Sequence, residues 1–241
     1  SGQHQDQLTF EYQERIAAED GYRDENGRKG VESFMREYYL HAATVNRTAA
    51  EIIERCTERP TPYRTLARLI GREIRPGVRV AQGELLVRDA KLFEEEPLNL
   101  LTVFRDSQRH GVALSSGTKR MVRDHLHRID DGMRCSAGAA RVFRDILRGK
   151  NDVYDTLLEM HKLGVLGAYI PEFGELLCMT QHDLYHIYTV DEHSLMGVRE
   201  LERLRNGAYQ KEVPLLTQVM REVDHVEMPL LGILFHDIGK G

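Results

Sequence analysis

The chain has 241 residues, of which 41% are hydrophobic and 29% are charged, and its formal net charge at pH 7 is −5. The negative balance argues against a general nucleic-acid binder, because phosphate contacts need a basic face. No apolar run reaches the ~20 residues of a membrane span, and the first residues lack the apolar core of a signal peptide, so we expect a cytoplasmic protein without a membrane or nucleic-acid partner.

The first half of the chain is dominated by helical spacing of apolar residues. Steps of three and four residues predict a long helix over residues 31–56 with one buried face. The prolines of segment 58–64 are expected to end this helix. Residues 78–87 instead alternate around Gly83, which predicts one small β-hairpin. Helical spacing returns over 93–111, where the triple glutamate 94–96 is expected in the first turn.

The second half is expected to be entirely helical. Helical segments are predicted over 115–131, 136–149 and 151–173, with Ser115, Ser136 and either Asn151 or Asp152 as N-caps. Another helix should begin near Val190, and a last apolar one should lead into the final residues. The predicted fold class is therefore mainly α, a helical bundle with one small β-hairpin, followed by the truncated start of a further α-helical domain.

Three cysteines, Cys56, Cys135 and Cys178, lie far apart without a CxxC spacing. This scatter predicts reduced thiols that fill the core, rather than disulfides or a cysteine zinc site.

The final segment, "LLGILFHDIGKG" (230–241), places His236 and Asp237 next to each other in an apolar run. Buried imidazole and carboxylate groups need a partner, and a divalent metal ion supplies one. His193 begins an amphipathic helix and is the natural third ligand, with the small Gly197 one turn later allowing close helix packing. For a lone histidine, a hydrogen bond to a carbonyl is the better interpretation, but the downstream dyad favours a metal site. One nitrogen and one oxygen ligand suit Mn, Fe, Mg or Zn.

These residues also carry a family resemblance. "HSL" at 193–195, followed some forty residues later by "HDIGKG", resembles the HD-superfamily phosphohydrolases, whose ligands follow the order H…HD…D. The strings "QHDLYHIYTVDEHSL" (181–195), "LGVLGAYIPEFGEL" (163–176) and "GVESFMREYYLHA" (30–42) are similar to the bifunctional uridylyltransferase and uridylyl-removing enzymes that modify the nitrogen-regulatory PII protein. This likeness covers nearly the whole chain.

The resemblance implies a domain order of nucleotidyltransferase, helical region, HD domain and regulatory ACT domains. Residues 1–75 would be the helical C-terminal part of the nucleotidyltransferase region, 76–180 a helical linking region, and 181–241 the truncated N-terminal part of the HD domain. The fourth metal ligand, an Asp, is expected beyond Gly241, and the isolated chain is expected to be inactive.

The resemblance also implies roles for individual residues. His193, His236 and Asp237 would be metal ligands, with His236 and Asp237 as the catalytic dyad and Mg or Mn favoured over Fe or Zn. Lys240 would face a substrate phosphate, or is simply a solvated lysine. His182, His186 and Asp191 would shape the substrate pocket, with capping and packing as the equal alternative.

The activity implied is hydrolysis by a metal-dependent phosphodiesterase that releases UMP from uridylyl-tyrosine on the PII protein, in an enzyme that also transfers UMP from UTP. Glutamine would act through the regulatory domains. Two alternatives remain open: an HD-type nucleotide phosphohydrolase of other specificity, and a catalytically inactive helical interaction module.

Overall fold

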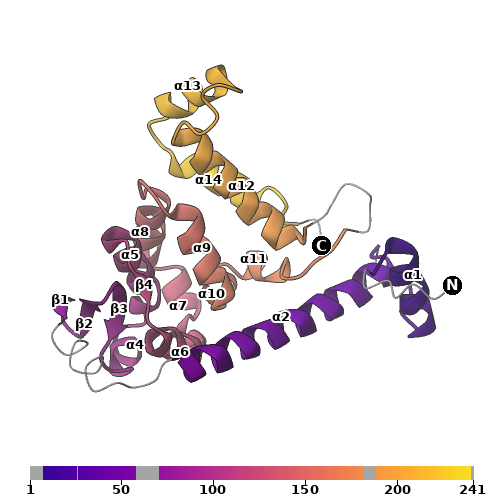
Figure 1. Cartoon of the computed structure of the whole chain (residues 1–241), viewed down its shortest axis with the longest axis horizontal. Helices are drawn as coiled ribbons and strands as arrows, with labels where there is room; N and C mark the ends of the chain where they lie inside the picture. Colours follow the sequence, from indigo (N-terminus) through magenta and orange to yellow (C-terminus); the bar gives the residue numbers. More distant parts are fainter. Residues whose placement is uncertain (1–7, 26, 58–70, 182–187, 240–241) are drawn as a thin grey trace.

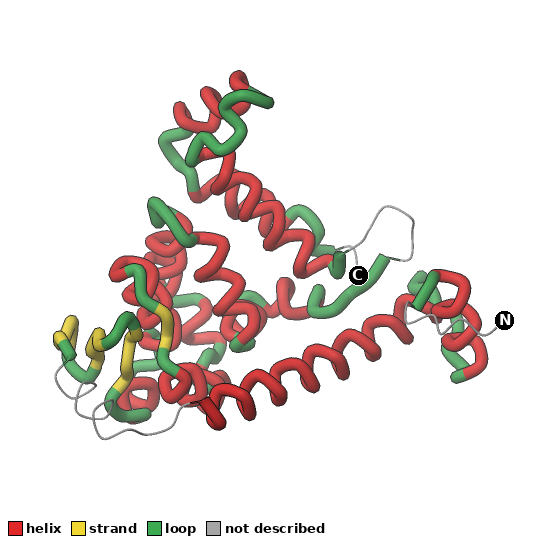
Figure 2. The backbone as a smooth tube through the Cα atoms, in the orientation of Figure 1, coloured by secondary structure: helices red, strands yellow, loops and turns green. Residues whose placement is uncertain are grey.

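The computed structural model describes residues 8–25, 27–57, 71–181 and 188–239 (Figure 1). Helices form most of this part of the chain, and strands are confined to one small sheet (Figure 2). The predicted mainly α fold is therefore confirmed. None of the described helices is both long and apolar enough to cross a membrane. Segment 58–64, which was expected to end the long helix, lies outside the described residues.

The sheet contains the predicted hairpin at its centre. Strands β2 (Val78–Ala81) and β3 (Glu84–Val87) pair antiparallel, with residues Gln82 and Gly83 at positive φ in the turn. Two strands that the pattern did not predict extend it: β1 (Arg72–Arg75) beside β2, and β4 (Ala113–Leu114) parallel to β3. Strand β1 has one apolar residue among four and β4 has only two residues, so neither shows a period-2 pattern.

The N-terminal helices form a small core of their own. Helices α1 (Phe10–Glu19) and α2 (Gly30–Thr57) bury Ala17, Val31 and Met35 between them. From there α2 runs as a single long rod along the underside of the molecule (Figure 1). The expected buried face is wrong for most of α2: the side chains further along are exposed, namely Tyr38 48%, Tyr39 37%, Val45 69% and Ile52 55%. The helix has the predicted periodicity, but the described chain supplies no layer to cover it.

The central body is a cluster of short helices around one large core. It contains α4 (Lys91–Glu95), α5 (Asn99–His110), α6 (Ser116–Asp124), the 3-10 helix η1 (Leu126–Arg128), α7 (Asp131–Arg134), α8 (Ala137–Leu147), α9 (Val153–Lys162), α10 (Val165–Tyr169) and α11 (Pro171–Glu175). Phe93, Phe104 and Phe173 are among its largest fully buried side chains. These residues belong to the same hydrophobic cluster as the C-terminal helices.

Local signals explain several helix ends. Ser115 and Ser136 accept hydrogen bonds from the Thr118 and Ala139 amides, so these two predicted N-caps are confirmed. Asp152 occupies the third predicted N-cap position, but its side chain makes no capping hydrogen bond. The expectation for the triple glutamate holds for Glu94, which lies in the first turn of the short helix α4, but α4 ends at Glu95 and a separate helix, α5, follows. The cause is the proline at position 97, which disfavours helical geometry in the residue before it; Glu96 is extended, with φ −138° and ψ 90°.

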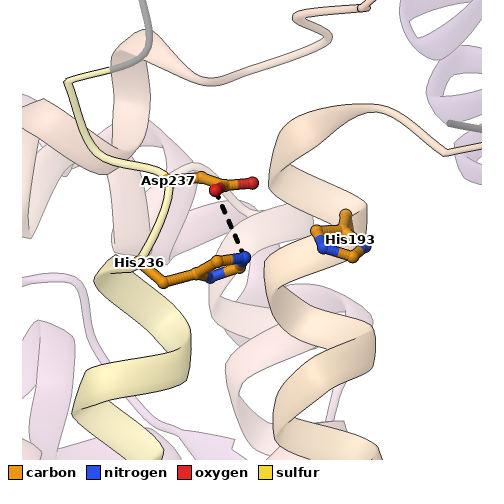
Figure 3. A group of neighbouring side chains, drawn as sticks. All are labelled: His193, His236 and Asp237. Atoms are coloured by element: carbon orange, nitrogen blue, oxygen red, sulfur yellow. Dashed lines mark ion pairs between the residues drawn. The ribbon is translucent and has the colours of Figure 1, made fainter. Parts of the chain in front are cut away.

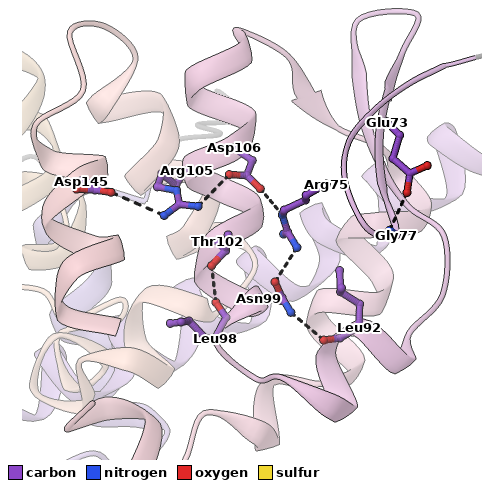
Figure 4. A network of polar contacts seen from close by, with 10 residues as sticks. All are labelled: Glu73, Arg75, Gly77, Leu92, Leu98, Asn99, Thr102, Arg105, Asp106 and Asp145. Carbon is purple, nitrogen blue, oxygen red and sulfur yellow. Dashed lines mark hydrogen bonds and ion pairs between the residues drawn. The ribbon is translucent and has the colours of Figure 1, made fainter. Parts of the chain in front are cut away.

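A chain of buried polar contacts ties the sheet to the helices (Figure 4). Arg75 of β1 lies 2.6 Å from Asp106 of α5 and donates to Asn99 at 2.8 Å. Asp106 also pairs with Arg105, which reaches Asp145 of α8 at 3.7 Å. Because a buried charge must be compensated, this network fixes β1 against α5 and α8.

The C-terminal part stands on the central body as a layer of three helices, α12 (Val190–Arg205), α13 (Pro214–Glu222) and α14 (Glu227–Phe235) (Figure 1). Helix α12 begins at Val190, where it was predicted, and packs against both α14 and α9. Leu195 and Val198 of α12 are buried in the main core.

Candidate metal centre

Two helices bring the predicted triad together. His193 lies in the first turn of α12, where its amide donates to the Thr189 carbonyl at 2.8 Å. His236 and Asp237 follow α14 directly, so they meet His193 only because α12 and α14 run antiparallel. One ligand atom from each of the three residues lies within 4.8 Å of the other two (Figure 3).

Gly197 makes this approach of the two helices possible. A Cβ atom at position 197 would lie 2.5 Å from Cγ1 of Ile233, which is closer than real side chains come. Ile233 is on α14, one turn before His236. The predicted role of Gly197 in close packing is therefore confirmed, because a side chain at this position would require its neighbour to shift.

Hydrogen bonding defines how the His236 ring is oriented. Its Nδ1 lies 2.7 Å from the Ile233 carbonyl, which can only accept, so Nδ1 carries the hydrogen. The opposite nitrogen, Nε2, lies 3.2 Å from Oδ1 of Asp237. In the neutral ring this nitrogen presents a lone pair to a carboxylate oxygen. A proton on Nε2, or a cation bound to both atoms, makes that contact favourable.

The donor set fits a divalent ion. The His193 and His236 ring centroids are 5.3 Å apart, so two imidazoles and one carboxylate converge. Imidazole nitrogens and a carboxylate oxygen are ligands that divalent ions such as Mn, Fe and Zn accept in proteins, so these three side chains could hold such an ion. Asp237 is 2% exposed, whereas the side chain of His236 is 33% exposed. The cluster is thus anchored on its buried side and open at His236, as sites that must admit a substrate are.

The remaining predicted site residues have different outcomes. Lys240, His182 and His186 lie outside the described residues. Asp191 is described and is 2% exposed, with Oδ2 2.9 Å from Nε2 of His161 on α9. Burial raises the pKa of Asp191, but the hydrogen bond and charge of His161, together with hydrogen bonds from Thr189 and Cys178, outweigh it and hold this pKa below its usual range. Of the two alternatives for Asp191, the geometry favours packing.

His161 was missed by the sequence reasoning. It is a single histidine in the last turn of α9, without a motif around it, and nothing local distinguishes it from a surface histidine. Its side chain is only 13% exposed because α12 covers it.

The cysteines do not contribute to the centre. All three are free thiols, in agreement with the expected reduced state, but only Cys178 is buried, and Cys56 and Cys135 are exposed. Core filling is therefore wrong for two of the three. Burial raises the pKa of the Cys178 thiol to about 11, so this thiol is a poor nucleophile and a poor metal ligand.

Comparison with known proteins gives the family. A model described as "Uridylyltransferase GlnD third domain" matches residues 79–169, and one described as "GlnD PII-uridylyltransferase" matches residues 1–53. The bifunctional uridylyltransferase/uridylyl-removing enzymes of Cereibacter sphaeroides and Ruegeria pomeroyi are each 35% identical over 100% of this chain, and that of Azospirillum brasilense is 34% identical over 100%. The chain belongs to this family of bifunctional uridylyltransferases. It spans about a quarter of the length of these relatives, 26%, 27% and 26% respectively.

The family models and the triad cover different parts of the chain. His193, His236 and Asp237 lie outside both matched ranges, while the matches to the uridylyltransferase relatives extend over the whole sequence.

Proposed function

We propose that His193, His236 and Asp237 form part of a divalent-metal phosphodiesterase site of the uridylyl-removing type. The observation that carries this proposal is the convergence of two imidazoles and a buried carboxylate within 4.8 Å from two antiparallel helices. The substrate we infer is a uridylylated tyrosine of the PII protein, and the product is UMP. The family names support the PII protein as the partner and removal of a uridylyl group as the reaction.

Each residue of the triad would contribute a different ligand group to the ion. Asp237 supplies a buried negative charge, and the two histidines supply neutral nitrogen donors. The Ile233 carbonyl accepts from Nδ1 of His236, so Nε2 would be the nitrogen that holds the ion. A divalent ion, with Mg or Mn favoured and Fe or Zn as alternatives, supplies Lewis acidity at the scissile phosphate. The exposed side of His236 leaves room for a phosphodiester to approach.

The transferase activity is proposed to use other residues. Residues 1–53 match the PII-uridylyltransferase model. We therefore assign transfer of UMP from UTP to the uridylyltransferase region of the enzyme, of which these residues would form a part. Regulation by glutamine would likewise involve parts of the family enzymes outside the described residues. The two activities should therefore be separable by mutation.

Metal binding is the first test. Titration of the chain with Mn²⁺ in a calorimeter should give a binding isotherm that His236→Ala or Asp237→Asn weakens at least about tenfold, because each removes a ligand. The matched control is His110→Ala, an exposed histidine at the end of α5. Equal Mn²⁺ affinity in all four folded proteins would contradict the site.

Activity is the second test, in a full-length family enzyme that carries this sequence. His236→Ala with Asp237→Ala should abolish release of UMP from uridylylated PII and leave transfer to PII largely intact. Equal loss of both activities would mean that they share one site. Release of phosphate from free nucleotides, but not of UMP from PII, would favour the HD hydrolase of other specificity. Neither metal binding nor hydrolysis would favour the interaction module.

A further inference from the structure

Helix α12 lies between the metal centre and the central body. On one side it packs against α14, and on the other against α9. Figure 1 shows α12 and α14 side by side above α8 and α9. The position of His193 is therefore set by how α12 rests on α9.

Polar contacts join α12 to α9 near both ends of α12, and Arg199 of α12 also lies over the Tyr154 ring of α9, 5.7 Å from its centroid. At the start of α12, Asp191 meets His161, with side chains 3% and 13% exposed. Near its end, Glu202 accepts hydrogen bonds from the amides of Val153 and Tyr154, each at 3.0 Å and each from a separate carboxylate oxygen.

The contact of Glu202 is an N-cap supplied by another helix. Asp152 occupies the N-cap position of α9, but its φ is +61° and its side chain makes no capping bond. The first two amides of α9 are satisfied by Glu202 instead, where the helix dipole favours a negative charge. Contact with α12 thus completes α9 itself.

The spacing along α12 places both contacts on one face and His193 on the other. Asp191 and Glu202 are separated by about three full turns at ~100° per residue, so they point the same way. His193 follows Asp191 by about 200° and therefore points to the opposite side, toward α14. Gly197, one turn further, shares that side and contacts Ile233.

The segment between α8 and α9 contacts the start of α14 and the end of α12. Arg148, which follows α8, lies 2.5 Å from Glu227 in the first turn of α14, and the Gly149 carbonyl accepts from Arg205 at 2.8 Å. Both helices that carry the triad are thus fixed to the body formed by residues 71–181.

We propose that His161 and Glu202 are positioning residues for the metal ligand His193. They act through Asp191 and the N-terminus of α9, which set the axial position and rotation of α12. A slip of one residue would move His193 by about 1.5 Å and ~100°, too much for a site whose donor atoms span 4.8 Å. The effect on metal affinity rests on the proposed metal site, but the positioning of His193 is testable without metal.

The variants separate positioning from general stability. His161→Leu removes the donor to Asp191, whereas His161→Gln keeps an N–H that can still reach it. Glu202→Ala removes the cap on α9. The matched control is Lys119→Met, which breaks the 2.7 Å pair between Lys119 and Glu159 of α9, and this pair does not involve α12. The control should lower the melting temperature without moving His193.

The first readout is the ¹⁵N spectrum of the histidine rings in metal-free protein. His161→Leu and Glu202→Ala should shift the His193 resonances, while those of His110 stay in place. The second readout is Mn²⁺ affinity, which should fall about tenfold in both variants and remain close to wild type in His161→Gln and Lys119→Met.

The outcomes are distinguishable. Unchanged His193 resonances in folded His161→Leu and Glu202→Ala would overturn the inference, whatever the metal data show. Shifted resonances in a wild-type protein that binds no Mn²⁺ would support the positioning and contradict the proposed function. Where His161→Leu does not fold, Glu202→Ala decides. An equal fall in Mn²⁺ affinity for Lys119→Met would show that general stability, and not positioning, controls the site.

Discussion

Glu227 is a buried carboxylate whose charge is controlled by a neighbouring arginine. It is 5% exposed, lies in the first turn of α14, and pairs with Arg148. The hydrogen bond from Arg148 lowers the pKa of Glu227 to about 2, and the charge of Arg148 acts in the same direction. The carboxylate thus remains ionised wherever the protein is folded under ordinary conditions, and holds the start of α14 on the central body.

This shift predicts the pH dependence of stability. The pKa of Glu227 is lower in the folded state than in the unfolded chain, so its ionisation stabilises the fold fully above about pH 4.5, the range of an ordinary glutamate. That contribution is lost as the pH falls toward 2. Urea unfolding should therefore show wild type more stable than Glu227→Gln at pH 7, with the gap narrowing between pH 4.5 and pH 3.

The control for this prediction is Glu222→Gln, which removes an exposed carboxylate from α13. It measures the general effect of one lost charge at each pH. A gap between wild type and Glu227→Gln that stays constant from pH 7 to pH 3 would show that the Arg148 pair does not depend on ionisation of Glu227.

At the scale of elements, the close contact between α12 and α14 depends on Gly197, which has no side chain. Gly197→Ala places a methyl group 2.5 Å from Cγ1 of Ile233, so the Ile233 side chain or the two helices must shift. We expect a loss of about 1–3 kcal/mol in the free energy of unfolding, as for other overpacked cores. Thermal or urea unfolding measures this loss.

Two comparison variants make the measurement specific. Gly232→Ala, on α14, has no atom within 4 Å of the added Cβ, so it should be neutral or stabilise by about 0.5–1 kcal/mol through helix propensity. Combining Gly197→Ala with Ile233→Ala removes the clashing atom, so the pair should lose less than the sum of the single variants. Strict additivity would mean that the two residues do not touch.

At the scale of the whole molecule, the described chain has two cores of unequal size. Ala17, Val31 and Met35 form the small one, and the large one extends from the sheet through the central helices to α14. The small core buries little apolar surface, so α1 and the start of α2 should open without the rest of the molecule. Arg36, which donates to the Glu175 and Leu177 carbonyls, links the two cores at the surface.

Native-state hydrogen exchange measures this difference. Amides of α1 should exchange at a lower opening free energy than those of α5, α8 and α9. Met35→Ala should speed exchange only in α1 and the start of α2, whereas Leu157→Ala, in the large core, should cost about 2–5 kcal/mol and speed exchange throughout α5, α8 and α9. Equal protection of α1 and α9 in the wild type would show one cooperative unit instead.

What the sequence determined by itself was local. Apolar spacing located α12 and the other long helices, alternation around Gly83 located the central hairpin, and Ser115 and Ser136 marked helix starts. The triad was predicted from the motif order, and Gly197 from its small size one turn after His193. Apart from the triad, whose His193 lies 43 positions before His236, each of these signals depends on residues a few positions apart, which the chain holds together in any fold.

Only the tertiary structure decided which surfaces meet. The partnership of His161 with Asp191 and the capping of α9 by Glu202 join residues 30 and about 49 positions apart, and no periodicity marks either pair. The exposed apolar face of α2 carries the same spacing as the buried face of α12. Burial depends on which element packs alongside, and this is a property of the packed molecule that spacing within one segment does not contain.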